Sequence, residues 1–190
     1  MNSVERGLRK IAREVLLKYR CKARYDLERK MFPKIRGKRV LFVGIANYTK
    51  DYPKKLKNNE IWTIDINSEV EKFGAKNHIV GSITEVDTYF PENFFDYIFF
   101  CGILGFGVNT ETDAEKTFEK CCKILKKDGI LIIGWDSFYS KVIPNQLKSF
   151  KLFKPVSRFG FPIGYQSRNR ERKSDERTKY AHNYDFLMKE

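Results

Sequence analysis

Two short apolar runs in the first third of the chain each end in a residue that could help to bind a nucleoside. Gly44 follows Val40–Val43, and Asp65 follows Ile61–Ile64. If the runs are neighbouring parallel strands, their carboxyl ends meet at the edge of the sheet where open α/β sheets bind ligands. A glycine there lets the backbone approach the ligand, and a carboxylate 21 residues later is placed to accept hydrogen bonds from both ribose hydroxyls. The alternative is that Asp65 only caps a turn at the end of a strand.

The elements that would position these residues can be read from the apolar pattern. Five apolar runs predict strands at residues 40–43, 61–64, 78–80, 97–100 and 130–133. Before the last of them, residues 112–125 have the spacing of an amphipathic helix, and Lys126–Gly129 predicts a helix stop and a turn. Strands that alternate with helices or long connections are typical of a parallel sheet with crossover connections.

The C-terminal part of the sequence predicts two further strands. Lys151–Phe153 is a weak candidate, and alternation from Tyr180 to Phe186 predicts the final strand. The polar residues 166–178 between them read as a loop, and a hairpin-like connection of this kind makes the final strand antiparallel. The expected fold is therefore α/β, with a central, mostly parallel, seven-stranded sheet whose last strand is antiparallel. Charged residues 168–173 lie in that loop and are either solvated or in contact with an anionic acceptor.

Positive charge is concentrated at the N-terminus. The formal net charge is +13, and residues 1–39 contain 14 Lys and Arg against 4 Asp and Glu. The rest of the chain is nearly neutral, which argues against a nucleic-acid surface spread over the whole domain. We therefore divide the chain into a basic N-terminal helical arm, residues 1–36, and a main domain, residues 37–190.

The arm has the apolar spacing of a helix from Val4 to Met31, and Pro33 is expected to end it. Three roles for this helix remain open at this point. It could pack its apolar stripe on the main domain, it could lie on a membrane surface or dock a partner through residues 3–31, or it could bind RNA.

Composition and motif spacing disfavour several classes of protein. The 190 residues suit a single domain, and no apolar run approaches the roughly 20 residues that cross a bilayer. Charges from Glu5 onward interrupt the apolar core that a secretion signal requires. None of the four cysteines has zinc-ligand spacing, and the two histidines lie far from any cysteine pair. We expect a cytoplasmic protein with free thiols and no structural metal.

The order of the predicted elements resembles the class I, Rossmann-like S-adenosylmethionine-dependent methyltransferases, over roughly residues 38–190. Segments similar to that family's motifs are, in chain order, Arg39–Gly44, Trp62–Ile66, Ile79–Ile83, Phe95–Gly102 and Cys122–Leu131. The last is the most specific, because its helix is followed by the sequence Leu-Lys-Lys-Asp-Gly-Ile-Leu. The resemblance implies a Rossmann-like methyltransferase fold.

The resemblance also implies S-adenosylmethionine as the cofactor. Its expected binding residues are Gly44, Ala46, Tyr48, Asp65, Ile66, Ser82, Ile83, Cys101 and Gly102. The sequence departs from the family pattern at four positions. The family usually has an acidic residue at the position of Phe42, glycines at those of Ala46 and Tyr48, and an acidic residue at that of Ser82. A nucleoside without phosphates tolerates this looser glycine loop better than a dinucleotide, whose pyrophosphate needs a glycine-rich turn at a helix N-terminus.

Methyl transfer requires mainly that the acceptor is aligned with the methyl group. A hydroxyl acceptor would also benefit from a general base, for which Asp136 and His182 are the candidates, although each also has a purely structural explanation. The loop Gly102–Gly107 lies where the family lines its transfer pocket, and Phe106 in it could contact the acceptor. Its three glycines could also be no more than a tight connection.

The sequence therefore predicts a methyltransferase that acts on oxygen or nitrogen of a small-molecule or glycan-type acceptor. The eroded glycine loop suggests one alternative, a non-catalytic relative that serves as a binding or scaffold protein. A second alternative is an RNA methyltransferase that holds its substrate with the basic arm. Nucleic acid is not the favoured partner, because the motif typical of transfer to base amino groups (Asn/Asp-Pro-Pro-aromatic) does not occur. The acceptor and the oligomeric state stay open.

Overall fold

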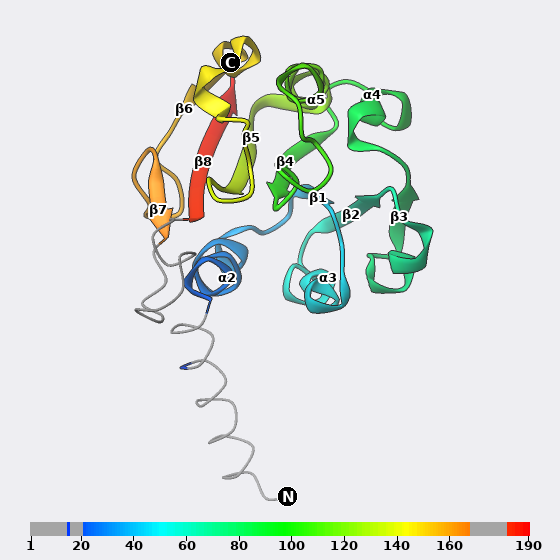
Figure 1. Ribbon diagram of the computed structural model, residues 1–190. Helices are drawn as coiled ribbons and strands as arrows, with labels where there is room; N and C mark the ends of the chain where they lie inside the picture. The colour runs from blue at the N-terminus through cyan, green and yellow to red at the C-terminus, as the bar shows by residue number, and fades with distance from the viewer. Residues whose placement is uncertain (1–14, 16–20, 168–181) are drawn as a thin grey trace, which may run out of the picture.

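The computed structural model describes residues 15, 21–167 and 182–190. Within these residues, eight strands form one sheet in the order β3-β2-β1-β4-β5-β8-β6, and β7 also pairs with β8 (Figure 1). The strands are β1 (Arg39–Val43), β2 (Glu60–Asp65), β3 (Asn77–Val80), β4 (Phe95–Cys101), β5 (Leu125–Asp136), β6 (Phe153–Pro155), β7 (Tyr165–Ser167) and β8 (His182–Lys189).

The sheet is mostly parallel, as expected. Strand β1 pairs in parallel with β2 and β4, β2 with β3, and β4 with β5. Strand β8 runs antiparallel to β5, which confirms the direction predicted for the final strand. Strands β6 and β7 pair with opposite ends of β8. The expected count of seven strands was therefore wrong by one, because two short strands share the last position of the sheet.

The apolar runs are continuous because both faces of the sheet are covered. Along β1, Leu41 and Val43 belong to one buried cluster, whereas Val40 and Phe42 belong to the other. Strands β4 and β5 alternate in the same way. Figure 1 shows α4 and α5 on one face and α2 and α3 on the other.

Helices of very different length cover these faces. Helix α5 (Glu111–Ile124) is the longest described and confirms the amphipathic pattern, and its N-cap Thr110 accepts a hydrogen bond from the Asp113 N–H. The shorter elements are α2 (Lys22–Asp26), α3 (Tyr52–Lys55) and α4 (Val86–Tyr89), the π-helix η1 (Leu27–Met31), and the 3₁₀ turns η2 (Phe32–Lys34), η3 (Asn47–Thr49), η4 (Ser68–Phe73), η5 (Ile83–Glu85), η6 (Pro144–Gln146) and η7 (Lys148–Leu152).

One local prediction was wrong. Residues Lys126–Gly129, expected as a turn between helix and strand, lie inside β5. The strand is nevertheless irregular at this point. Asp128, next to Gly129, has a φ of 61°, and the pairing register of β5 with β4 shifts between Phe95 and Tyr97. The stretch is thus a distorted beginning of β5 rather than a separate turn.

The described part of the N-terminal arm packs on the sheet. Ala23, Leu27 and Met31, four residues apart, are buried together with Phe32 and Ile35 in the cluster that covers the α3 face. Residues 21–36 thus pack their apolar side chains on the main domain, which is one of the three roles considered for the arm. The division of the chain at residue 36 is a prediction that these contacts do not test.

The remaining predictions for the arm concern residues outside the described part, apart from Val15. The same holds for the charged stretch 168–173 and for most of the loop 166–178. In the described ranges, no helix is long and apolar enough to cross a membrane. All four cysteines are described, and each is free.

Candidate functional site

A pocket of about 340 Å³ opens at the carboxyl ends of β1, β2 and β4. From β1 the chain first adds β2 and β3 on one side of the sheet and then β4 and β5 on the other side. The pocket lies at this topological switch point, which is where open α/β sheets bind ligands. The residues that line it are Val43, Gly44, Ile45, Tyr48, Ile64, Asp65, Ile66, Gly81, Ser82, Ile83, Cys101, Gly102, Ile103, Phe106 and Gly107. Its volume lies within the range typical of small-molecule and cofactor sites, roughly 300–1,000 Å³.

Among the described residues of this lining, Asp65 has the only charged side chain. Its Oδ2 accepts the Ile45 N–H at 2.8 Å, and its Oδ1 accepts the Asn67 N–H at 2.8 Å. The carboxylate is thereby fixed between the ends of β1 and β2. Each ionised carboxylate oxygen can accept more than one hydrogen bond, so both oxygens keep capacity for a ligand.

Two glycines give the ligand access to the backbone. Gly44 has a φ of 75° and Gly102 a φ of 72°, in the left-handed region that favours glycine. A Cβ on Gly44 would stand 2.5 Å from Cδ1 of Ile103, whereas a Cβ on Gly102 would meet no atom within 4 Å. Gly44 therefore allows the loop after β4 to close against β1, and Gly102 leaves open space beside its backbone.

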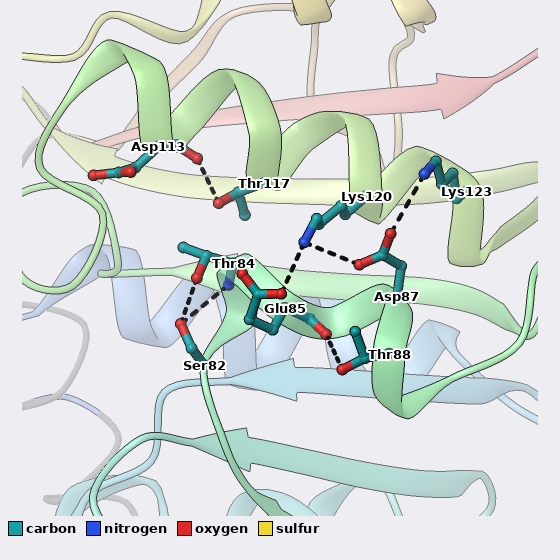
Figure 2. Close-up of polar contacts among 9 residues, drawn as sticks. All are labelled: Ser82, Thr84, Glu85, Asp87, Thr88, Asp113, Thr117, Lys120 and Lys123. Atoms are coloured by element: carbon teal, nitrogen blue, oxygen red, sulfur yellow. Dashed lines mark hydrogen bonds and ion pairs between the residues drawn. The ribbon is translucent and has the colours of Figure 1, made fainter.

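Ser82 and Ile83 follow β3 and form the third side of the pocket. The Ser82 Oγ accepts the Thr84 N–H at 3.2 Å and lies 2.7 Å from the Thr84 Oγ1, which caps η5 (Figure 2). Ile83 is buried. Where the family usually has a carboxylate, this chain thus has a hydroxyl that is already partnered within its own turn.

Helix α5 holds this third side in place through ion pairs (Figure 2). Lys120 lies 3.2 Å from a Glu85 oxygen and 3.1 Å from an Asp87 oxygen, and Lys123 lies 3.4 Å from Asp87. Partial burial alone would raise the pKa of Asp87, but Lys120 and Lys123 outweigh it and hold that pKa below its ordinary value. These contacts join the segment after Ile83 to the helix that follows the β4 loop.

The departures from the family's first motif have physical explanations. Phe42 is buried, with its ring 5.0 Å from that of Tyr52 and 5.7 Å from that of Phe99, so a carboxylate at this position would lie in the apolar core. Ala46 lies outside the lining; its N–H donates to the Thr49 Oγ1. Tyr48 is 66% exposed and lines the pocket from its rim.

The two candidate general bases face each other across β5 and β8, where Asp136 pairs with His182. Neither lines the pocket. The Asp136 Oδ1 accepts the Phe138 N–H at 2.8 Å. Burial lowers the pKa of His182 to about 4, against the opposing effect of Asp136, so the imidazole is neutral near pH 7. Asp136 and His182 thus lie opposite each other on neighbouring strands, but outside the pocket lining.

Gly134 makes room between His182 and the pocket. The His182 Nε2 and the Cys101 Sγ each lie 3.0 Å from the point that a Cβ on Gly134 would occupy. Cys101 itself lines the pocket, and burial raises the pKa of its thiol to about 12, so it stays protonated. The Cys101 thiol and the His182 ring thus both border the space beside Gly134, but only Cys101 lines the pocket.

Eight of the nine predicted cofactor residues line the same pocket, and Ala46 is the exception. The residues that sequence reasoning did not assign to the cofactor site include Ile45, Gly81, Ile103 and Gly107. Ile45 and Gly81 are next in the sequence to the assigned residues Gly44 and Ser82, so both could have been predicted from their position. The side chain of Ile103 fills the space beside Gly44, which no local pattern shows.

Comparison with protein families gives a match over this part of the chain. Residues 43–133 match the model of a family described as a methyltransferase domain. Over this stretch, just under half of its length, the chain is similar to methyltransferases. The matched residues include every residue that lines the pocket, so the candidate site lies within the stretch that resembles a methyltransferase domain.

Solved structures show the same fold. The N-methyltransferase NodS from Bradyrhizobium japonicum is similar with a TM-score of 0.64 and 13% identity, covering 90% of this chain and 96% of NodS. A TehB-like methyltransferase from Corynebacterium glutamicum gives 0.63 and 15%, with 99% and 100% covered. The 1,6-didemethyltoxoflavin N1-methyltransferase from Burkholderia thailandensis gives 0.53 and 14%, with 100% and 91% covered. Comparison with curated protein sequences finds no match.

Proposed function

We propose that this protein binds S-adenosylmethionine in the pocket between β1, β2 and β4 and transfers its methyl group to a small molecule. The observation that carries the proposal is Asp65. Its two oxygens are fixed by backbone N–H groups at 2.8 Å, at the end of β2, in a pocket of cofactor size. A carboxylate held in this way is prepared to accept hydrogen bonds from two adjacent ribose hydroxyls.

The rest of the lining fits the other parts of the cofactor. Ile66 and Ile83 offer apolar surface for the adenine ring, next to the Ser82 turn. Gly102 leaves open space beside its backbone for a ligand, and Gly44 lets Ile103 pack against the end of β1. The lining includes no helix N-terminus rich in glycine of the kind that a pyrophosphate requires. These features suit a nucleoside without phosphates.

When bound, the cofactor supplies a methyl group that is already activated by its sulfonium. What this chain must supply is alignment of an acceptor and, for a hydroxyl acceptor, a base. Phe106 lies on the pocket rim, 65% exposed, with its ring 5.1 Å from that of Tyr139, and offers a surface for the acceptor. The two candidate bases, Asp136 and His182, lie outside the pocket lining, and the lowered pKa of His182, about 4, makes its imidazole a weak base.

The proposed acceptor class is a small molecule, methylated at oxygen or nitrogen. Two of the similar structures point in this direction, since one is an N-methyltransferase and another holds 1,6-didemethyltoxoflavin together with S-adenosylhomocysteine. The moderate pocket, with an apolar rim and a single charged lining residue, also suits a small acceptor. A glycan-type acceptor is the alternative that an acceptor screen would distinguish.

Calorimetric titration with S-adenosylhomocysteine tests the site. Asp65→Asn removes the charge that both ribose hydroxyls would contact, so we expect affinity to fall at least about tenfold relative to wild type. Asp113→Asn is the matched control, because Asp113 also contacts its local turn, through Thr110, but lies outside the pocket. Equal affinity in Asp65→Asn and wild type would contradict the proposed site. A wild type that binds no adenosyl ligand would favour the scaffold alternative.

A further inference from the structure

Most of the excess positive charge of the described chain lies in one stretch. Residues 21–60 contain twelve Lys and Arg against four Asp and Glu, whereas residues 61–190 contain nineteen against eighteen. The basic character of the N-terminal arm therefore continues past the first strand, through α3 and into the turn before β2.

The parts of this stretch come together on one side of the sheet. Figure 1 shows α2 and α3 on the same face. An ion pair between Lys55 and Glu28 joins α3 to η1. The Gly37 N–H donates to the Asn58 carbonyl at 2.8 Å, which joins the turn before β1 to the turn before β2. The cations of these segments thus lie on one continuous surface.

Most carboxylates of the stretch are already used by cations of the same stretch. The pairs are Lys22 and Lys30 with Asp26, Lys55 with Glu28, and Arg39 with Glu60. Arg36, Lys50, Lys54 and Lys57 are exposed, and within the described residues no carboxylate lies within ion-pair distance of them. We call these four residues the basic surface. Like charges that gather without counter-charges repel one another, and an anionic partner relieves that repulsion.

The basic surface borders a hollow of about 360 Å³ at the amino ends of β1, β2 and β4. The charged residues that line it are Lys38, Arg39, Lys57, Lys126, Glu60 and Asp96. Both carboxylates are paired within this lining; Asp96 lies 3.5 Å from Lys38 and 3.0 Å from Lys126. Because the candidate cofactor pocket lies at the carboxyl ends of the strands, an anion beside Lys57 would not compete with the cofactor.

We propose that the basic surface binds the phosphate backbone of a nucleic acid. Cations spread over several segments, rather than gathered on one, match a polymer that offers a row of phosphates. The proposal assigns the nucleic acid a binding surface and does not make it the methyl acceptor, so it is independent of the proposed function. It also agrees with the nearly neutral charge of residues 61–190.

The same residues fit a membrane surface less well. Elements that bind a bilayer surface insert apolar side chains as well as presenting cations. In residues 21–60, all of which the structure describes, the apolar side chains of α2, η1 and α3 are directed into the core. Tyr48 is the only exposed large apolar side chain of this stretch, and it lines the candidate cofactor pocket.

Fluorescence anisotropy with a labelled single-stranded RNA of about 20 nucleotides and mixed sequence tests the proposal. In the double variant Lys54→Gln, Lys57→Gln we expect the Kd to rise about tenfold at roughly 0.1 M salt. The slope of log affinity against log salt should become shallower by about 1.4, since each lost phosphate contact contributes about 0.7. Both lysines are exposed and without a carboxylate partner, so the Tm should stay that of wild type.

The double variant Lys116→Gln, Lys151→Gln is the matched control. It removes the same two charges from exposed positions on α5, which covers the other face of the sheet, and on η7, whose Ser149 N–H donates to Glu115 of α5. Its Kd for the RNA should stay within about twofold of wild type.

Loss confined to the Lys54 and Lys57 variant supports the proposal. Equal loss in both double variants would show that the RNA responds only to net charge, and no loss in either would show that it binds elsewhere on the chain; both results overturn the inference. The inference also fails if wild type does not bind the RNA but sediments with vesicles of phosphatidylserine and phosphatidylcholine, or binds neither.

Discussion

Asp26→Asn should destabilise the protein strongly, although it lies outside the proposed cofactor contacts. Asp26 is fully buried, and its carboxylate pairs with Lys22 at 2.7 Å and Lys30 at 2.9 Å. It also accepts hydrogen bonds from the hydroxyls of Tyr165 at 2.7 Å and Ser167 at 3.2 Å. One carboxylate thus joins the N-terminal segment to β7, at the far edge of the sheet.

The magnitude follows from these contacts. Removal of one partner of a buried ion pair costs about 3–5 kcal/mol, but both lysines are partly exposed and can be rehydrated, so we expect about 2–3 kcal/mol. For a chain of this size, that corresponds to a decrease in Tm on the order of 4–12 °C. Urea denaturation and thermal unfolding would measure it. Glu119→Gln, which neutralises an exposed carboxylate on α5, is the control.

The pH dependence provides a second check. Burial alone would raise the pKa of Asp26, but hydrogen bonds from Lys22, Lys30 and Tyr165 outweigh it and hold that pKa below its ordinary value. The stabilisation is therefore fully present above the unfolded pKa and is lost as pH falls through the lower folded pKa. The difference in unfolding free energy between wild type and Asp26→Asn should be constant above about pH 5 and shrink below about pH 4. A difference under about 1 kcal/mol at pH 7, or one that does not change at low pH, would refute this reasoning.

Two further substitutions have defined outcomes. Gly44→Ala should reduce affinity for S-adenosylhomocysteine, because the added Cβ would stand 2.5 Å from the Ile103 Cδ1 and displace a side chain that lines the pocket. Gly37→Ala is the control: Gly37 also has a positive φ, of 64°, but an added Cβ there would meet no atom within 4 Å. Calorimetry should show unchanged affinity for this variant, and unfolding experiments should show only a moderate loss of stability. His182 contributes stability that is present above its unfolded pKa near 6.5 and is lost as pH falls toward about 4; His182→Gln should flatten that part of the stability–pH curve. A curve of unchanged slope would contradict the burial of the imidazole.

Much of the fold could be predicted from the sequence because the sheet is covered on both faces. Runs such as Val40–Val43 and Ile130–Ile133 are continuously apolar for that reason, and glycine or aspartate marks where several of them end. Strand β7 was not predicted, and the weak strand predicted at Lys151–Phe153 overlaps β6 only at Phe153, because Lys148–Leu152 forms the 3₁₀ turn η7. Strands β6 and β7 each have three residues, and they pair with β8 only after the chain has folded back over a long distance. Short strands of this kind are set by tertiary pairing rather than by local pattern.

The candidate site was predictable where it depends on strand ends. Asp65 and Gly102 each end or follow a strand, and the parallel sheet brings such ends together. The contact of Ile103 with Gly44 could not be derived from spacing, because it depends on how the loop after β4 packs against the end of β1. The position of His182 outside the pocket lining was equally unpredictable, since it depends on the register between β8 and β5.

A crystal structure of the protein grown with S-adenosylhomocysteine tests the central claim most directly. The account predicts adenosine in the pocket between β1, β2 and β4, with both ribose hydroxyls within hydrogen-bond distance of the Asp65 carboxylate and the base between Ile66 and Ile83. Adenosine bound elsewhere, or ribose hydroxyls directed away from Asp65, would contradict it.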